Sequence, residues 1–101
     1  MNHYERLCQL LDYTRRLSDD ECNELKALLK PEQLAIVEQA EKDCADLSLS
    51  YFDVDARSRQ WMVGIGMEIN RQTMFKYAVL QRLISEVIHR AGNLRGTKFS
   101  E

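Results

Sequence analysis

Apolar residues recur at steps of three and four along most of this 101-residue chain. That spacing places them on one face of a helix. Few residues interrupt it, because the whole chain contains one proline and four glycines. The pattern predicts an all-α fold, a small bundle of four to five helices with a long C-terminal helix. We expect one helical domain over residues 1–93, closed by Gly92 and Asn93 as helix-ending residues, and a flexible C-terminal tail over residues 94–101.

Local signals predict where the first helices begin and end. The apolar spacing near the N-terminus favours a first helix that runs to about Leu17. Ser18 and Glu21 have the spacing of a capping box, which predicts the start of a second helix. Pro31 suits the first turn of a third helix and disfavours helical geometry in the residue before it. From Leu34 to Val54 the apolar seam is nearly continuous, so we expect the third helix to be long.

The C-terminal helix is expected over residues 74–91, and its apolar surface is wide. Tyr77, Leu80, Ile84 and Val87 form one stripe, and neighbouring apolar residues widen it until few polar positions remain. Such a helix has to be covered on more than one side, and a domain of this size has a limited interior. We therefore predict that the chain forms a homodimer, with self-association through these four residues.

The most apolar run is WMVGIGMEI, residues 61–69, and it has two interpretations. The run LSLSYFDV, residues 47–54, alternates apolar and polar side chains, and Trp61 begins a second such run. A β-hairpin at about residues 47–69 would give an α+β fold as the alternative. We prefer the helical interpretation, because an isolated two-stranded sheet is marginal in water and the segment between the runs lacks the sequence of a tight turn.

If residues 61–69 are helical, Gly64 leaves a notch in an apolar surface. Either another helix of the same domain or a partner protein fills that notch. On the second interpretation the partner-binding residues are Trp61, Met62, Gly64 and Met67, with Trp61 as the aromatic anchor and the methionines adapting to the partner's shape.

The sequence gives no pattern for catalysis, and we expect no enzyme activity. The glycines of GIG lack the third glycine of a dinucleotide-binding loop, and the two histidines have no neighbouring nucleophile in a known motif. We predict no cofactor and no metal, because the histidines lie at opposite ends of the chain and the three cysteines form no CxxC pair. The cysteines are expected to be reduced packing residues, and we expect a cytoplasmic protein with no membrane segment.

Charge divides the chain into two halves. Residues 1–54 contain 6 basic and 12 acidic side chains, whereas residues 55–101 contain 8 basic and 4 acidic ones. We expect a small regulatory or adaptor protein, acting as an inhibitor, modulator or assembly factor by helix-mediated binding to a protein partner. The alternative is a small dimeric transcriptional regulator that contacts DNA through its basic C-terminal half.

Residues 4–43 resemble the small Hha-type modulators, which act by associating with a nucleoid protein. The resemblance is carried by the length of the segment, its helix layout, the acidic character of the third helix and the pair Leu34 and Ala35. It does not extend to Trp61 and beyond, and no site residue is taken from it.

Overall fold

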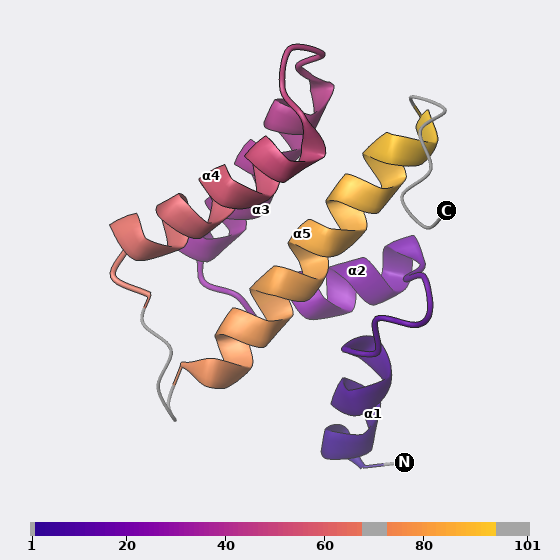
Figure 1. Cartoon of the computed structure of the whole chain (residues 1–101). Helices are drawn as coiled ribbons and strands as arrows, with labels where there is room; N and C mark the ends of the chain where they lie inside the picture. Colours follow the sequence, from indigo (N-terminus) through magenta and orange to yellow (C-terminus); the bar gives the residue numbers. More distant parts are fainter. Residues whose placement is uncertain (1, 68–72, 95–101) are drawn as a thin grey trace.

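The computed structural model describes residues 2–67 and 73–94, and every regular element in them is an α-helix. The five helices are α1 (His3–Leu10), α2 (Asp19–Lys26), α3 (Pro31–Ala45), α4 (Tyr51–Gly64) and α5 (Met74–Leu94). The predicted all-α bundle with a long C-terminal helix is therefore confirmed (Figure 1). The hairpin alternative at residues 47–69 is wrong, because most of that range forms α4.

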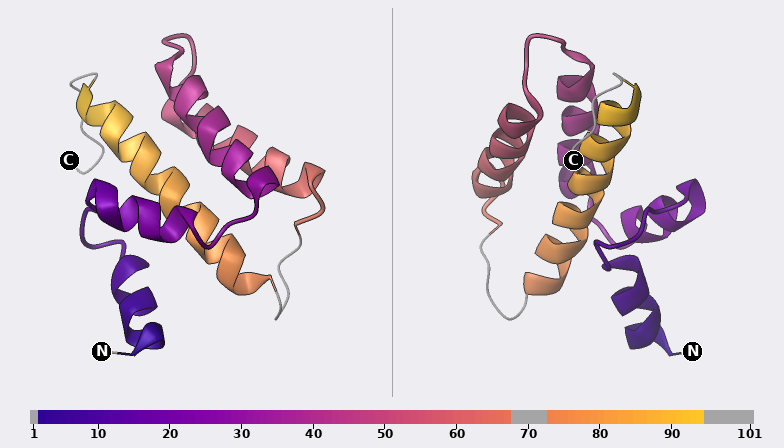
Figure 2. Two further views of the ribbon diagram at one scale, coloured as in Figure 1. Left: turned by 180° about the vertical axis from the view of Figure 1, so that it is seen from behind. Right: turned by 45° about the vertical axis from the view of Figure 1, so that its right-hand side comes forward.

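Helix α5 is the centre of the fold. It packs against α2, α3 and α4, and α3 also packs against α4 (Figures 1 and 2). The right-hand view of Figure 2 shows α1 and α2 on one side of α5, and α3 and α4 on the other. The buried apolar core is formed by Leu10, Leu17, Cys22, Leu25, Leu29, Ile36, Val37, Ala40, Cys44, Val54, Met62, Met67, Val79, Leu80, Leu83 and Ile84.

Two predicted helix starts agree with the structure. Ser18 accepts a hydrogen bond from the backbone N–H of Glu21, and the Glu21 carboxylate accepts one from the Ser18 N–H, which completes the capping box of α2. The Ser18 backbone N–H also holds the pKa of Glu21 below its ordinary value. Pro31 is the first residue of α3, and the preceding Lys30 has an extended backbone.

The single long helix expected from Leu34 to Val54 is wrong, because the chain leaves the helix between Ala45 and Tyr51. Asp46 accepts hydrogen bonds from the backbone N–H and the hydroxyl of Ser48, both to Oδ1. Ser50 then forms a capping box with Asp53 and starts α4. Short polar side chains that bond to nearby backbone compete with the helix, and here they end it although the apolar spacing continues.

Helix α1 also ends earlier than expected, at Leu10 instead of about Leu17. Asp12 Oδ1 accepts hydrogen bonds from the backbone N–H and hydroxyl of Thr14, an arrangement that favours a turn. Leu17 is nevertheless buried, so its apolar character reflects packing outside a helix. At the other end, α5 continues through Gly92 to Leu94, so Gly92 does not end it as predicted, and residues 95–101 of the predicted tail lie outside the described residues.

The run WMVGIGMEI contains the end of α4 and the turn that closes it. Gly66 has a φ of 73°, a left-handed conformation that favours glycine. Its N–H donates to the Val63 carbonyl, and the Met67 N–H donates to the Met62 carbonyl, both at 2.9 Å. These two bonds make a Schellman motif, and Met62 and Met67 are both buried beside it. Gly66 therefore forms the turn, whereas Gly64 is the last residue of α4.

The two glycines are expected to respond in opposite ways to replacement by alanine. Gly66→Ala should lower the free energy of unfolding by about 1–2 kcal/mol, because a Cβ is strained at positive φ. Gly64→Ala should leave it unchanged or raise it by up to about 1 kcal/mol, because a Cβ there meets no atom within 4 Å and alanine favours the helix. Urea denaturation followed by circular dichroism measures both, and a destabilised Gly64→Ala would contradict this description of the α4 end.

Candidate functional site

The C-terminal end of α4 presents Trp61 beside an open space. Trp61 is 51% exposed, and a side chain added at Gly64 would meet none of the described residues within 4 Å. No helix among the described residues fills the space beside Gly64, which favours the partner interpretation over packing within the domain. Met62 and Met67 are buried in the core, so of the four predicted partner-binding residues the structure brings only Trp61 and Gly64 to the surface.

A shallow hollow adjoins Trp61 on the same part of α4. Arg57, Gln60, Trp61 and Gly64 line it, all from one helix. The Arg57 guanidinium lies 3.7 Å from the Asp43 carboxylate of α3, so it is held near the edge of the hollow while half of its side chain stays exposed. An aromatic side chain, a cation and an amide lie around the open space beside Gly64. This set can bind an apolar side chain and hydrogen-bond the segment that carries it.

The predicted self-association residues lie elsewhere and differ in exposure. Leu80 and Ile84 are fully buried among the chain's own helices, and therefore present no surface to a second chain in this structure. Tyr77 and Val87 are partly buried against the same core. Helices α3 and α4 pack against α5 and cover much of its apolar face, while Tyr77 and Val87 keep part of their surface exposed, so self-association through them stays a prediction.

Sequence reasoning missed a buried ion network on α5. Arg82 is 0% exposed and Glu86 2%, and Arg82 Nη1 donates to Glu86 Oε2 at 3.2 Å. The same carboxylate lies 3.3 Å from Arg16 Nη1 and 3.4 Å from Arg90 Nε. The width of the apolar stripe could have indicated this network. A helix that is covered on several sides must bury some of its polar residues.

These α5 side chains hold the segment between α1 and α2. Arg82 donates to the Arg15 carbonyl at 2.6 Å, and Arg90 donates to the Leu17 carbonyl at 2.8 Å. The Arg82 guanidinium also lies 5.1 Å from the centre of the Tyr13 ring, within the range of a cation–π contact. Arg82 Nε is buried and has no hydrogen-bond partner among the described residues. The network therefore stabilises the fold, because it donates hydrogen bonds to the backbone carbonyls of Arg15 and Leu17, which lie outside the helices.

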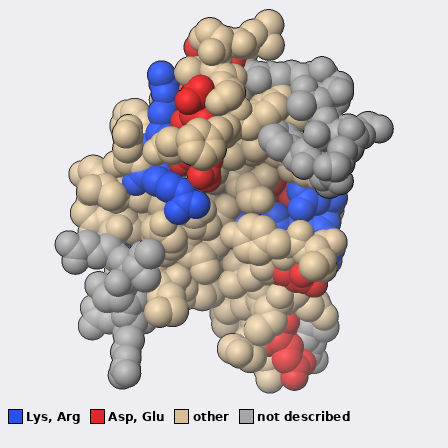
Figure 3. Space-filling view, in the orientation of Figure 1, with Lys and Arg blue, Asp and Glu red and all other residues tan. Residues whose placement is uncertain are grey.

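The basic second half of the chain is largely occupied by ion pairs where it is described. Arg59 pairs with Asp55 at 3.0 Å, and Arg90 with Asp19 at 2.8 Å. Arg71, Arg95 and Lys98 lie outside the described residues. Figure 3 shows acidic and basic side chains next to one another over α4 and beside α5, without a broad basic area on that face of the described structure.

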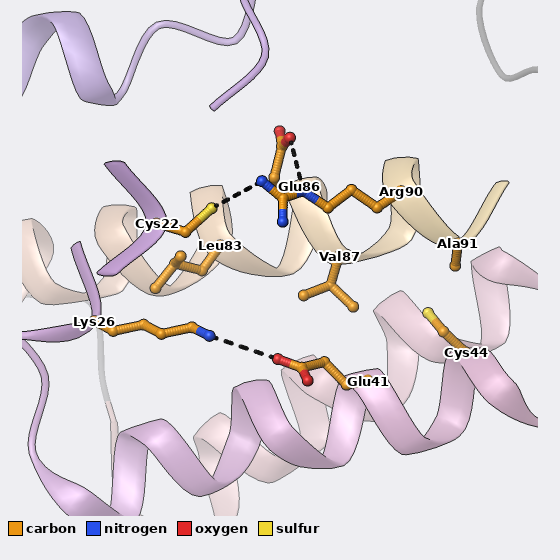
Figure 4. Close-up of a pocket in the computed structure, with 9 residues that line it drawn as sticks. All are labelled: Cys22, Lys26, Glu41, Cys44, Leu83, Glu86, Val87, Arg90 and Ala91. Atoms are coloured by element: carbon orange, nitrogen blue, oxygen red, sulfur yellow. Dashed lines mark hydrogen bonds and ion pairs between the residues drawn. The ribbon is translucent and has the colours of Figure 1, made fainter. Parts of the chain in front are cut away.

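A cavity of about 330 Å³ lies between α2, α3 and α5 (Figure 4). The charged groups around it are paired with one another, Lys26 with Glu41 at 3.7 Å and Arg90 with Glu86 at 3.4 Å. The rest of its lining is apolar or thiol. With no unpaired charge directed into the cavity among the groups in Figure 4, we assign no ligand to it. No group of three or more metal-ligating side chains occurs among residues 2–67 and 73–94.

The three thiols have different surroundings. Cys22 and Cys44 are buried in the core, as expected of packing residues, whereas Cys8 is exposed on α1. Burial raises the pKa of the Cys22 thiol, although the nearby Arg90 guanidinium opposes this effect. Cys22 therefore stays protonated in the folded protein to a higher pH than an exposed cysteine does.

Alkylation of the native protein is expected to separate the thiols. At about pH 8, iodoacetamide should modify Cys8 rapidly and Cys22 and Cys44 far more slowly, because the thiolate is the reactive form and the buried thiols are shielded. Mass spectrometry of peptides from timed samples measures the three rates. Equal rates in native buffer, with denatured protein as the control, would contradict the buried positions of Cys22 and Cys44.

No helix in the described part of the chain is both long and apolar enough to span a membrane. Comparisons with protein-family models, curated proteins and solved structures found no match, and the resemblance of residues 4–43 to the Hha-type modulators gains no support from them.

Proposed function

We propose that this protein is a small non-enzymatic adaptor or regulator that binds a protein partner through the end of α4. The observation that carries the proposal is the open space at Gly64 beside the half-exposed Trp61. Tryptophan is the side chain most often found at the energetic centre of protein interfaces. An isolated exposed apolar residue needs no explanation, but a tryptophan beside an unfilled glycine notch supports a surface shaped for contact.

The partner's contacting segment should be apolar in its centre and acidic or carbonyl-rich at its edge. Its apolar side chain would enter the space beside Gly64 and pack against the Trp61 ring. Its polar groups would meet Arg57 and Gln60, which line the same hollow. An exposed helix or an extended segment of another protein has these features. By covering such a segment, this small protein would regulate the partner, because the covered segment could not make its other contacts.

The DNA-binding alternative has less support. Of the five described basic residues of the second half, Arg82 is buried, and Arg59 and Arg90 are paired with carboxylates at 3.0 Å and 2.8 Å. Arg57, which lies 3.7 Å from Asp43, and Lys76 keep exposed surface, and these two do not form a broad basic area. Phosphate contacts require exposed cations, and binding through them falls steeply with salt. A partner complex held at Trp61 should change little between about 50 and about 200 mM salt, whereas a nucleic-acid complex should weaken by orders of magnitude.

A capture experiment with matched variants tests the proposal. Tagged wild type, Trp61→Ala and Gly64→Leu are incubated with nuclease-treated extract of the source cells. Tyr4→Ala, on the distant helix α1 and 74% exposed, is the control for loss of an exposed aromatic residue. We expect one protein to be retained by wild type and Tyr4→Ala and lost at least tenfold from both α4 variants, which should melt close to wild type.

Two outcomes would contradict the proposal. Equal capture by all four forms would place the binding surface away from Trp61. Collapse of both α4 variants in thermal denaturation would make this stretch part of the core.

A further inference from the structure

A second exposed stripe runs along α4 on another side of the helix. Phe52 and Val63 are 81% and 75% exposed, and Arg59 and the partly exposed Ala56 lie between them. The steps from Phe52 through Ala56 and Arg59 to Val63 are four, three and four, so the four side chains share one face. At about 100° per residue, this face is roughly opposite Trp61.

The four positions of the stripe, though not their residue types, are symmetric about a point midway between residues 57 and 58. Phe52 and Val63 are equally distant from that point, and so are Ala56 and Arg59. In an antiparallel pair of identical helices related by a two-fold axis, residues at equal distances from the centre face each other. Phe52 of one copy would then lie against Val63 of the other, with Ala56 against Arg59 in the middle.

The charges on this face fit the same arrangement. Within one chain, Arg59 Nε donates to Asp55 Oδ2 at 3.0 Å. In the antiparallel pair, Asp55 of one copy and Arg59 of the other lie on the same edge, displaced by about one residue, or roughly 1.5 Å, along the helix. A parallel pair would instead bring Arg59, which lies near the centre of the stripe, against Arg59 of the second copy, which opposes association. Figure 3 shows side chains of both signs next to one another over α4.

From this symmetry and charge pattern we infer that α4 binds a second copy of the same chain, antiparallel, through Phe52, Ala56, Arg59 and Val63. The contact between Phe52 and Val63 would extend about 17 Å along the helix, which is short for an interface of about 800 Å² per partner. The dimer should therefore dissociate at low concentration, with a Kd on the order of tens of micromolar. This inference is independent of the proposed function, because the dimer leaves Trp61 accessible.

Sedimentation equilibrium of the full chain tests the dimer. The mass of the wild type should rise towards twice the monomer mass between about 1 and about 500 µM. Phe52→Glu and Val63→Glu should remain monomeric, whereas Tyr4→Glu, an equally exposed position on α1, should associate like the wild type. Circular dichroism checks that each variant is folded. A wild type that stays monomeric at the highest concentration, or folded α4 variants that dimerise like the wild type, would overturn the inference.

Charge reversal tests the antiparallel arrangement even if an apolar variant unfolds. Asp55→Arg alone brings positive charges together in the dimer, and Arg59→Asp alone brings negative charges together, so each should lower the association constant at least tenfold. An equimolar mixture of the two variants restores both cross-chain pairs and should associate as strongly as the wild type. If the mixture associates no better than either variant alone, the proposed pairing is wrong.

Discussion

Leu80→Glu is expected to abolish the folded state of this protein. Leu80 is fully buried on α5, at the centre of the core. Removing a buried leucine side chain typically costs about 2–5 kcal/mol, and burying an unpaired carboxylate adds several more. The sum approaches the whole stability of a typical domain, about 5–15 kcal/mol. Circular dichroism and thermal denaturation should show little helix and no cooperative transition.

The control for this variant is Val63→Glu on α4. It introduces the same charge at a side chain that is 75% exposed, so we expect the helical spectrum and the unfolding transition to be retained. A cooperatively folded monomer of Leu80→Glu would show instead that Leu80 lies at a surface between chains. That result would support the predicted self-association through the apolar stripe of α5.

The second large effect is expected from the buried pair Arg82 and Glu86. Glu86→Ala should lower the free energy of unfolding by about 3–5 kcal/mol, because it leaves Arg82 buried without its carboxylate. The exposed pair Arg59 and Asp55 has the same four-residue spacing, and Asp55→Ala should cost less than about 0.5 kcal/mol. Urea denaturation of the two variants compares them directly.

A double variant separates the charge from the packing of this network. Replacing Arg82 with Met and Glu86 with Leu removes both buried charges together, and should cost less than the sum of the two single replacements, with a coupling of at least about 1 kcal/mol. Additive costs, or a Glu86→Ala variant as stable as the wild type, would contradict the buried ion pair.

The fold class was predictable because the apolar period and the caps act locally. Ser18 with Glu21, and Pro31, start helices through bonds and angles within a few residues, and the structure confirms them. The break before α4 was missed because apolar spacing continues through it, while Asp46 and Ser50 end and start helices through side-chain bonds. The sequence pattern of these turns and caps is Asp46 with Ser48, and Ser50 with Asp53. It predicts a break, but we gave more weight to the continuous apolar spacing.

The candidate site was only half predictable, for a physical reason. A helical period places Trp61 and Gly64 on an apolar run, but it does not say which side chains the other helices cover. Met62 and Met67 are buried by tertiary packing and the Schellman turn. The count of basic residues in the second half did not distinguish the buried Arg82 from exposed cations, and its burial follows from the packing of α5 and its hydrogen bond to the segment before α2. Burial of that kind depends on contacts between distant parts of the chain.

The most direct measurement of the central claim uses Trp61 itself, which is the single tryptophan of the chain. Protein labelled with 5-fluorotryptophan gives one fluorine NMR signal, and the captured partner is added unlabelled. If the partner binds at the end of α4, the signal should shift, and its relaxation by a soluble paramagnetic agent should fall because the half-exposed ring becomes covered. A complex that forms while the signal and its accessibility stay unchanged would contradict binding at Trp61.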